Sequence, residues 1–316
     1  MKRTLALLLA ALLLVTFALT GCSAQKTNLK LATGSATGTY YAYGAAFTQV
    51  LSANIQGLTF DVQSTGASKA NIYNLADGEV DMGIVQNDVA DYAYRGVDLF
   101  DGEQITDFVA IAGMYAEVCQ VVGTPNMTSI ADLKGKRVSV GDIGSGTEFN
   151  AKQILSAYGI SFDDITVHNL SFGDSATAFK DGKIDAFFCT AGAPTTAIVE
   201  LATTNALNIL AVDDEHAAKL IADYPFYTQF AIPRGSYKGV DADVMTVAVK
   251  ATLVCKKSLS DDLVYKITKA LFEKKADITT AHPKGAELDA AYAVAGISID
   301  FHPGAAKYFK EVGAMK

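Results

Sequence analysis

The hydrophobic pattern of the first half of the chain alternates between short strand-like runs and longer helix-like runs. The predicted strands cover residues 29–33, 59–63 and 80–85. After the first strand and its polar loop, Tyr43 and Phe47 recur at helical spacing and are expected to be core residues. Gly78 is suited to end the second helix, and Asn87 or Asp88 is suited to cap the third. The pattern therefore predicts a repeated strand–loop–helix unit.

The same order of elements returns in the second half of the chain. The predicted strands cover residues 137–140, 166–170 and 184–188, and helical patterns follow them. The segment ADGEVDMGI (76–84) resembles KDGKIDAFF (180–188), and both occupy the same place in their series. Pro194 is suited to the first turn of the helix after the third strand. We infer that the chain contains two similar modules.

Alternation of strands and helices predicts an α/β fold with parallel sheets that carry helices on both faces. In such sheets ligands bind beyond the carboxyl ends of the strands, where loops and helix N-termini converge. A strand at 245–254 and a helix at 260–275 are expected to return the chain to the first module. We predict two lobes around one cleft, and 316 residues exceed the usual size of a single core. The predicted boundaries are residues 29–114 with 230–316 for domain 1 and 115–229 for domain 2.

The N-terminus has the features of an export signal. Lys2 and Arg3 precede an apolar run, residues 5–15, that is too short to span a bilayer. The ending L-T-G-C resembles a bacterial lipobox, in which Cys22 is lipidated. We expect a signal peptide at 1–21, then a lipid anchor and linker at 22–28, and a protein held on the outer face of the cytoplasmic membrane or in the periplasm. An ordinary signal peptide with an incidental cysteine is the alternative.

Charge and composition exclude several kinds of partner. The formal net charge of −8 becomes about −10 once Lys2 and Arg3 are removed, which argues against nucleic acid. The three cysteines beyond the signal, Cys119, Cys189 and Cys255, match no zinc spacing. We interpret them as buried apolar residues, with one disulfide as the alternative. No cofactor is expected, because the glycine loops lack both the G-x-G-x-x-G and the P-loop patterns.

Catalytic patterns are weak. Ser145 lies in G-S-G followed by Thr147, not in the G-x-S-x-G of a nucleophile elbow. The four histidines lie outside the predicted cleft loops, and those before Pro283 and Pro303 are expected to begin turns or helices. We therefore expect a protein that is not an enzyme, with an exported hydrolase as the least favoured alternative.

Binding fits the loops better than catalysis does. Helix N-termini carry free N–H donors and partial positive charge, so they hold carboxylates without arginine. Asp88 and Glu148 are candidates for contact with a ligand ammonium group, which favours a zwitterion such as an amino acid. The alternative is that both only cap helices, Glu148 through the S-x-x-E capping box that begins at Ser145.

Several segments together resemble the TAXI-type solute-binding proteins of TRAP transporters. They are TGSATGTYY (33–41), STGAS (64–68), DMGIVQND (81–88), DLKGKRVSVG (132–141), GSGTE (144–148), DAFF (185–188) with AG (191–192), and HPGA (302–305). The resemblance implies a two-lobed periplasmic-binding fold, type II-like, that closes on its solute. It also implies delivery to the membrane subunit of a TRAP transporter, and solutes such as glutamate, glutamine or related dicarboxylates.

The same resemblance implies the ligand contacts. They are Gly38, Thr39, Tyr40, Thr65, Gln86, Asp88, Ser145, Gly146, Thr147, Glu148, Thr190, Ala191 and Gly192. This sequence departs from the family at Ser35, Ala42 and Cys119-Gln120, where another glycine, a proline and Val or His are usual. We expect a monomer. An exported module that senses the same solute and signals to a membrane protein is the main alternative to a transport receptor.

Overall fold

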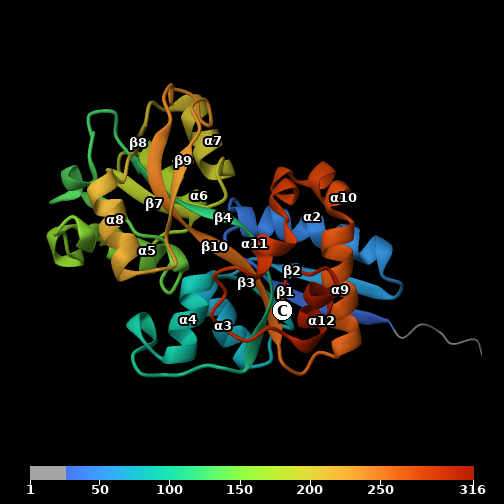
Figure 1. Ribbon diagram of the computed structural model, residues 1–316. Helices are drawn as coiled ribbons and strands as arrows, with labels where there is room; N and C mark the ends of the chain where they lie inside the picture. Colours follow the sequence, from blue (N-terminus) through green and yellow to red (C-terminus); the bar gives the residue numbers. More distant parts are fainter. Residues whose placement is uncertain (1–25) are drawn as a thin grey trace, which may run out of the picture.

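One mixed sheet of ten strands runs through both lobes of the protein (Figure 1). The computed structural model describes residues 26–316, so the predicted signal peptide and Cys22 lie outside the described residues. The strand order is β2-β1-β3-β10-β4-β7-β5-β6, with β8 beside β4 and β9 beside β10. The predicted parallel pairing is confirmed among β1, β2 and β3 and among β5, β6 and β7. It was wrong for β4 and β10, which run antiparallel to their neighbours.

The first lobe surrounds three parallel strands. Its elements are β1 (Thr27–Ala32), α2 (Thr39–Asn54), β2 (Leu58–Gln63), α3 (Ser68–Ala76), β3 (Met82–Gln86), α4 (Asn87–Arg95), η1 (Asp98–Phe100), α9 (Asp261–Glu273), α10 (Lys275–Ala281), η4 (Pro283–Glu287), α11 (Ala290–Val294) and α12 (Pro303–Glu311). Tyr43 and Phe47 are fully buried in its core, as predicted. The N-cap of α4 is Gln86, the last residue of β3. The prediction of Asn87 or Asp88 was therefore wrong by one or two residues.

The second lobe repeats this arrangement. Its elements are η2 (Ile130–Leu133), β5 (Arg137–Ser139), α5 (Gly146–Ala157), η3 (Phe162–Asp164), β6 (Thr166–His168), α6 (Phe172–Lys180), β7 (Ala186–Ala191), α7 (Thr196–Thr204), β8 (Asn208–Leu210), α8 (Asp214–Asp223) and β9 (Thr228–Ile232). Pro194 lies before α7, whose N-cap is Thr195, so its predicted place in the first helical turn was wrong.

The repeated sequence segment has the same structural role in both lobes. Asp81 accepts a hydrogen bond from the backbone N–H of Lys30 at 2.9 Å, and Asp185 accepts one from Arg137 at 2.9 Å. Asp81 directly precedes β3 and Asp185 directly precedes β7, so each aspartate aligns the start of that strand with the first strand of its lobe. The glycines of the two D-G turns, Gly78 and Gly182, both have positive φ angles, of 76° and 66°. The predicted duplication is confirmed at this level.

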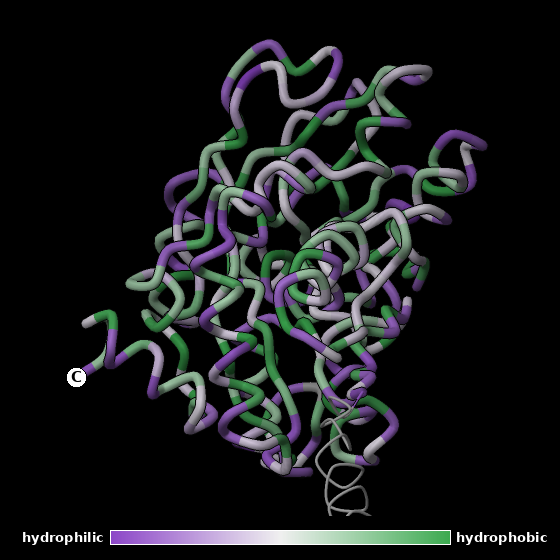
Figure 2. Tube along the Cα trace, turned by 90° about the vertical axis from the view of Figure 1, so that its right-hand side faces the viewer, coloured by the Kyte–Doolittle hydropathy of each residue, from purple (hydrophilic) through white to green (hydrophobic). Residues whose placement is uncertain are grey.

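Two long strands cross between the lobes: β4 (Phe108–Gly123) and β10 (Val244–Lys256). Separate hydrophobic clusters fill the two lobes, and in Figure 2 the hydrophobic segments run through the middle of the molecule while several of the outermost loops are hydrophilic. Ile232 and Tyr237 pack in a cluster of the second lobe, whereas Val254 packs in the first. The chain thus passes between lobes within these strands, and the domain boundaries at 114/115 and 229/230 stay a prediction.

The remaining sequence predictions concern single residues. Cys119, Cys189 and Cys255 are buried free thiols, which agrees with their interpretation as apolar core residues. His282 and His302 each cap a helical segment that begins with proline, as predicted. Within residues 26–316, no helix is both long enough and apolar enough to cross a bilayer.

Candidate functional site

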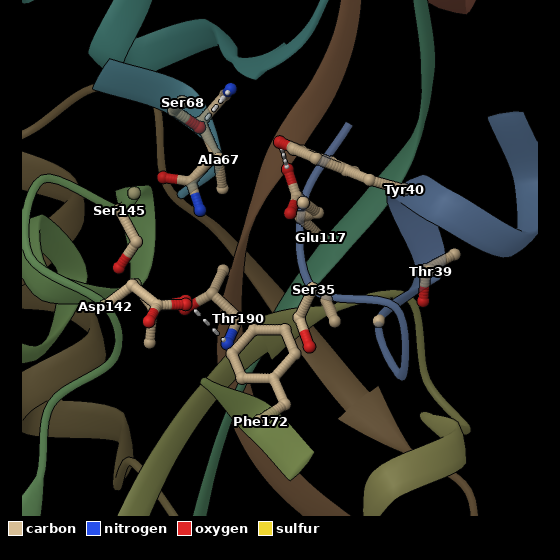
Figure 3. Close-up of a pocket in the computed structure, with 16 residues that line it drawn as sticks. Ser35, Thr39, Tyr40, Ala67, Ser68, Glu117, Asp142, Ser145, Phe172 and Thr190 are labelled. Atoms are coloured by element: carbon tan, nitrogen blue, oxygen red, sulfur yellow. Dashed lines mark hydrogen bonds between the residues drawn. The ribbon is translucent and has the colours of Figure 1, made fainter. Parts of the chain in front are cut away.

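A pocket lies between the two lobes, beyond the carboxyl ends of β1, β3 and β5 (Figure 3). Its cavity volume of about 30 Å³ has room for about two water molecules, so the two walls lie close together in this structure. Nine of the predicted contacts line it: Gly38, Thr39, Tyr40, Gln86, Ser145, Gly146, Thr147, Thr190 and Ala191. The loops of both modules therefore meet at one cavity.

Helix N-termini form much of the pocket wall. Gly38, Ala67, Gln86 and Ser145 are the N-caps of α2, α3, α4 and α5, and all four line the cavity. The caps of α2, α3 and α4 make no side-chain hydrogen bond to the first turn of their helices. At α3 the N–H of Lys69 donates to the carbonyl of Gly144, and at α4 the carboxylate of Asp88 accepts from the N–H groups of Asp88 and Val89. The N–H groups at the start of α2, together with the positive ends of the helix dipoles, suit a carboxylate.

The four other predicted contacts lie outside the lining of this cavity. Thr65 holds the loop before α3: its Oγ1 accepts from the N–H of Ala67 at 3.1 Å and lies 2.6 Å from Asn71 Oδ1. This fixes Ala67 at a φ of 67°, a strained conformation for a non-glycine residue. Gly192 borders the site, and its carbonyl accepts from Thr39 Oγ1 at 3.1 Å.

The two predicted ammonium-binding acids both face elsewhere. Asp88 is fully buried behind the pocket, where it accepts from Asn150 Nδ2 at 3.2 Å. Glu148 accepts from the N–H of Gly144 at 2.6 Å, while Ser145 Oγ accepts from the N–H of Glu148. Only half of the predicted capping box is therefore formed, because Glu148 bonds to Gly144 and not to Ser145.

The acid that does enter the pocket is Glu117, which the sequence analysis missed. It lies in the middle of β4, a strand of sixteen residues that is otherwise apolar or small apart from Gln120. Its side chain is 2 % exposed, and its Oε2 accepts from the hydroxyl of Tyr40 at 2.6 Å (Figure 3). Asp142, in the loop after β5, and Phe172, the first residue of α6, also line the cavity. The sequence signal that could have identified Glu117 is a single acidic residue within an otherwise apolar run.

The lobes touch beside the pocket, through α4 and α5. Asn150 Nδ2 donates to Asp88 Oδ2 and to the hydroxyl of Tyr227, at 3.2 and 2.9 Å. Gln153 Nε2 donates to the hydroxyl of Tyr92 at 3.1 Å, and Lys152 pairs with Asp98 at 2.7 Å. We call this contact the α4–α5 interface. It is a direct contact between the two lobes.

Gly146 permits the lobes to approach at the pocket itself. A Cβ atom added to Gly146 would lie 2.2 Å from the amide of Gln86 across the cleft. Gly146→Ala should therefore weaken solute binding by about 1–3 kcal/mol, or roughly 5- to 150-fold, because overpacking opposes lobe contact. Titration calorimetry would measure this, with Gly66→Ala as control, since a Cβ there meets only Ala70 at 3.4 Å. Equal affinities for the two variants would contradict the expectation.

Comparison with known proteins places the chain in a family. The sequence profile of the NMT1-like family matches residues 31–313. The chain belongs to the NMT1-like family. Its match to the family begins two residues before Thr33 and so includes every pocket-lining loop described above.

Solved structures share the fold of this NMT1-like chain. The alkanesulfonate-binding protein SsuA from Xanthomonas axonopodis pv. citri, bound to MOPS, superposes with a TM-score of 0.51 and 14% identity over 93% of this chain and 82% of that one. PhnD1 from Prochlorococcus marinus, in complex with methylphosphonate, superposes with a TM-score of 0.55 and 11% identity, over 82% of this chain and 90% of that one. A putative L-cystine ABC transporter from Listeria monocytogenes superposes with a TM-score of 0.52 and 17% identity, over 83% of this chain and 98% of that one. The predicted two-lobed periplasmic-binding fold is thereby confirmed.

The pocket of the NMT1-like chain offers groups for binding. Serine, threonine and tyrosine hydroxyls, helix N-termini and two carboxylates line it, and Phe172 adds an apolar surface. Within residues 26–316, no group of three or more His, Cys, Asp or Glu side chains could hold a metal ion. Ser145 Oγ is engaged with the first turn of α5, and the pocket lining contains no histidine beside it. The arrangement is typical of a binding site.

Proposed function

We propose that the protein is an extracytoplasmic receptor for a small carboxylate solute, namely a glutamate- or glutamine-like amino acid or a related dicarboxylate. The observation that carries the proposal is the pocket between two lobes, lined by the N-terminal ends of four helices and by hydroxyl groups. The named structural neighbours, two of which hold a sulfonate or a phosphonate by title, support a binding role for the fold.

The proposed mechanism is closure of the lobes around the solute. β4 and β10 would act as the hinge between domain 1 (29–114 and 230–316) and domain 2 (115–229), because they are the strands that pair across the lobes. Contacts such as that of Thr39 with Gly192 exist only when the lobes meet. A solute that bonds to both walls therefore favours the closed state through these added contacts.

The proposed partner is the membrane subunit of a TRAP transporter, on the strength of the TAXI-type motifs. Lipidation of Cys22 would hold a monomeric receptor beside this subunit on the outer face of the membrane. A second candidate is the membrane subunit of an ABC importer, because a structural neighbour is by title a putative ABC transporter for cystine. Uptake that stops when an ionophore collapses the ion gradient at constant ATP would favour TRAP; uptake that persists would favour ABC.

Equilibrium binding tests the receptor role. Purified protein is screened by thermal shift against the twenty amino acids, dicarboxylates, 2-oxo acids, alkanesulfonates and phosphonates. A solute at 100 times its Kd should stabilise the fold by about 2.7 kcal/mol. The solute should be recovered unchanged by NMR, and small-angle scattering should show compaction. A folded protein that binds no compound of the panel would contradict the proposed function, and turnover would favour the hydrolase.

A further inference from the structure

We propose that the solute carries an ammonium group, and that Glu117 is the residue that binds it. This inference rests on the proposed function and narrows its substrate class to amino acids, with dicarboxylates, sulfonates and phosphonates excluded. The charged side chains of the cavity are the first observation that supports it. Of the sixteen residues that line the pocket, two are acidic, Glu117 and Asp142, and none is Lys, Arg or His. A dianionic solute would meet two carboxyl groups and no cation.

Glu117 is placed as a receptor group would be. It comes from the strand that crosses between the lobes, and its carboxylate borders the cavity together with Tyr40 (Figure 3). Among the described residues, the ion pairs do not include Glu117. Burial raises the pKa of this carboxyl well above its usual range, while the Tyr40 hydroxyl opposes the shift. Burial without a cation therefore favours the protonated form of this carboxyl, and a ligand ammonium would supply the positive charge that favours the carboxylate.

The other end of an amino acid also finds its partner in this pocket. The N-terminus of α2, whose N-cap Gly38 makes no side-chain hydrogen bond, presents N–H donors to the cavity, and the start of α5 faces it from the other lobe. These ends suit the α-carboxylate without any basic side chain. An ammonium beside Glu117 and a carboxylate at the helix ends account for both charges of a zwitterion.

If Glu117 has only a structural role, a different binding result is expected. In that case the glutamate would only accept the Tyr40 hydroxyl, and its charge would be irrelevant to the solute. The chain contains a matched pair that serves as control: Tyr73 donates to Glu103 Oε2 at 2.6 Å, the same distance as in the Tyr40–Glu117 pair, but Glu103 is exposed on the surface. Glu117→Gln and Glu103→Gln thus replace a carboxyl by an amide in the same kind of hydrogen bond, inside and outside the pocket.

The experiment compares solutes that differ only in the amine. Calorimetry measures the best solute of the panel and its deamino analogue, for example glutamine against glutaramate or glutamate against glutarate, on the wild type and both variants. We expect amine loss to weaken wild-type binding on the order of 100-fold, and Glu117→Gln to weaken amino-acid binding by a similar factor while abolishing the preference for the amine. Glu103→Gln should bind as the wild type does.

Each result decides between the two proposals. If the best solute lacks an amine, or if Glu117→Gln keeps both affinity and amine preference, the ammonium inference is overturned and the receptor function stands. If no compound of the panel binds, the receptor function is contradicted and the inference falls with it. The melting temperature of Glu117→Gln without solute separates folding from binding, and it should equal or exceed that of the wild type.

Discussion

Phe149→Ala is expected to lower the free energy of unfolding by about 3–5 kcal/mol and to weaken solute binding as well. Phe149 belongs to α5 of the second lobe, but its fully buried ring lies in a hydrophobic cluster of the first. It stacks on Tyr92, with ring centroids 5.7 Å apart, and contacts Phe100 at 6.1 Å. Truncation leaves a cavity within the α4–α5 interface, so the state in which the lobes touch loses the most stability.

The control is a phenylalanine of similar burial that stays within one lobe. Phe179 packs on Phe187 of its own lobe, with centroids 5.8 Å apart. Phe179→Ala should destabilise the protein in urea but leave the affinity of the folded protein for solute unchanged. Phe149→Ala should reduce both, and Phe149→Leu, which keeps most of the volume, should reduce both less. Equal affinities for Phe149→Ala and Phe179→Ala would show that the α4–α5 interface does not contribute to closure.

Local sequence signals were sufficient for the loops that form the pocket. Glycines and hydroxyl residues between a strand and a helix identify helix N-termini, and parallel strands bring such ends to one edge. The loops around Thr39, Gln86 and Thr147 were therefore predictable, and they meet at one cavity. Tyr43 and Phe47 were predictable as core residues because helical periodicity reports which face is buried.

Features that depend on pairing between distant segments were not predictable from one sequence. β4 pairs with β10, more than one hundred residues away, and this pairing determines both the antiparallel centre of the sheet and the direction in which Glu117 points. Asp88 lies two residues after the end of β3, which leads into the pocket, so the sequence suggested a ligand contact. The phase of α4 instead turns its side chain towards Asn150 of the other lobe.

That burial makes Asp88 the source of a pH dependence. Removal from water raises the pKa of its carboxyl to about 7, although N–H groups at the start of α4 and the amide of Asn150 oppose the shift; the charge of Asp98 adds to it. In the unfolded chain the pKa is about 3.9. The native state thus holds this proton up to a higher pH than the unfolded state does. The stability from Asp88 is fully present below about pH 4 and is lost as the pH rises through about 7.

Asp88→Asn should remove this loss. Three pKa units correspond to about 4 kcal/mol at most, so we expect the variant to be more stable than the wild type at pH 8, by about 2 kcal/mol, and to lose that advantage at pH 4. Urea unfolding of both proteins at pH 4, 6 and 8 measures the difference, which compares like with like because every other titratable group is the same in both proteins. If the variant is less stable than the wild type at pH 8, ionised Asp88 stabilises the start of α4. The site between the lobes would then favour the charged carboxylate over the neutral acid.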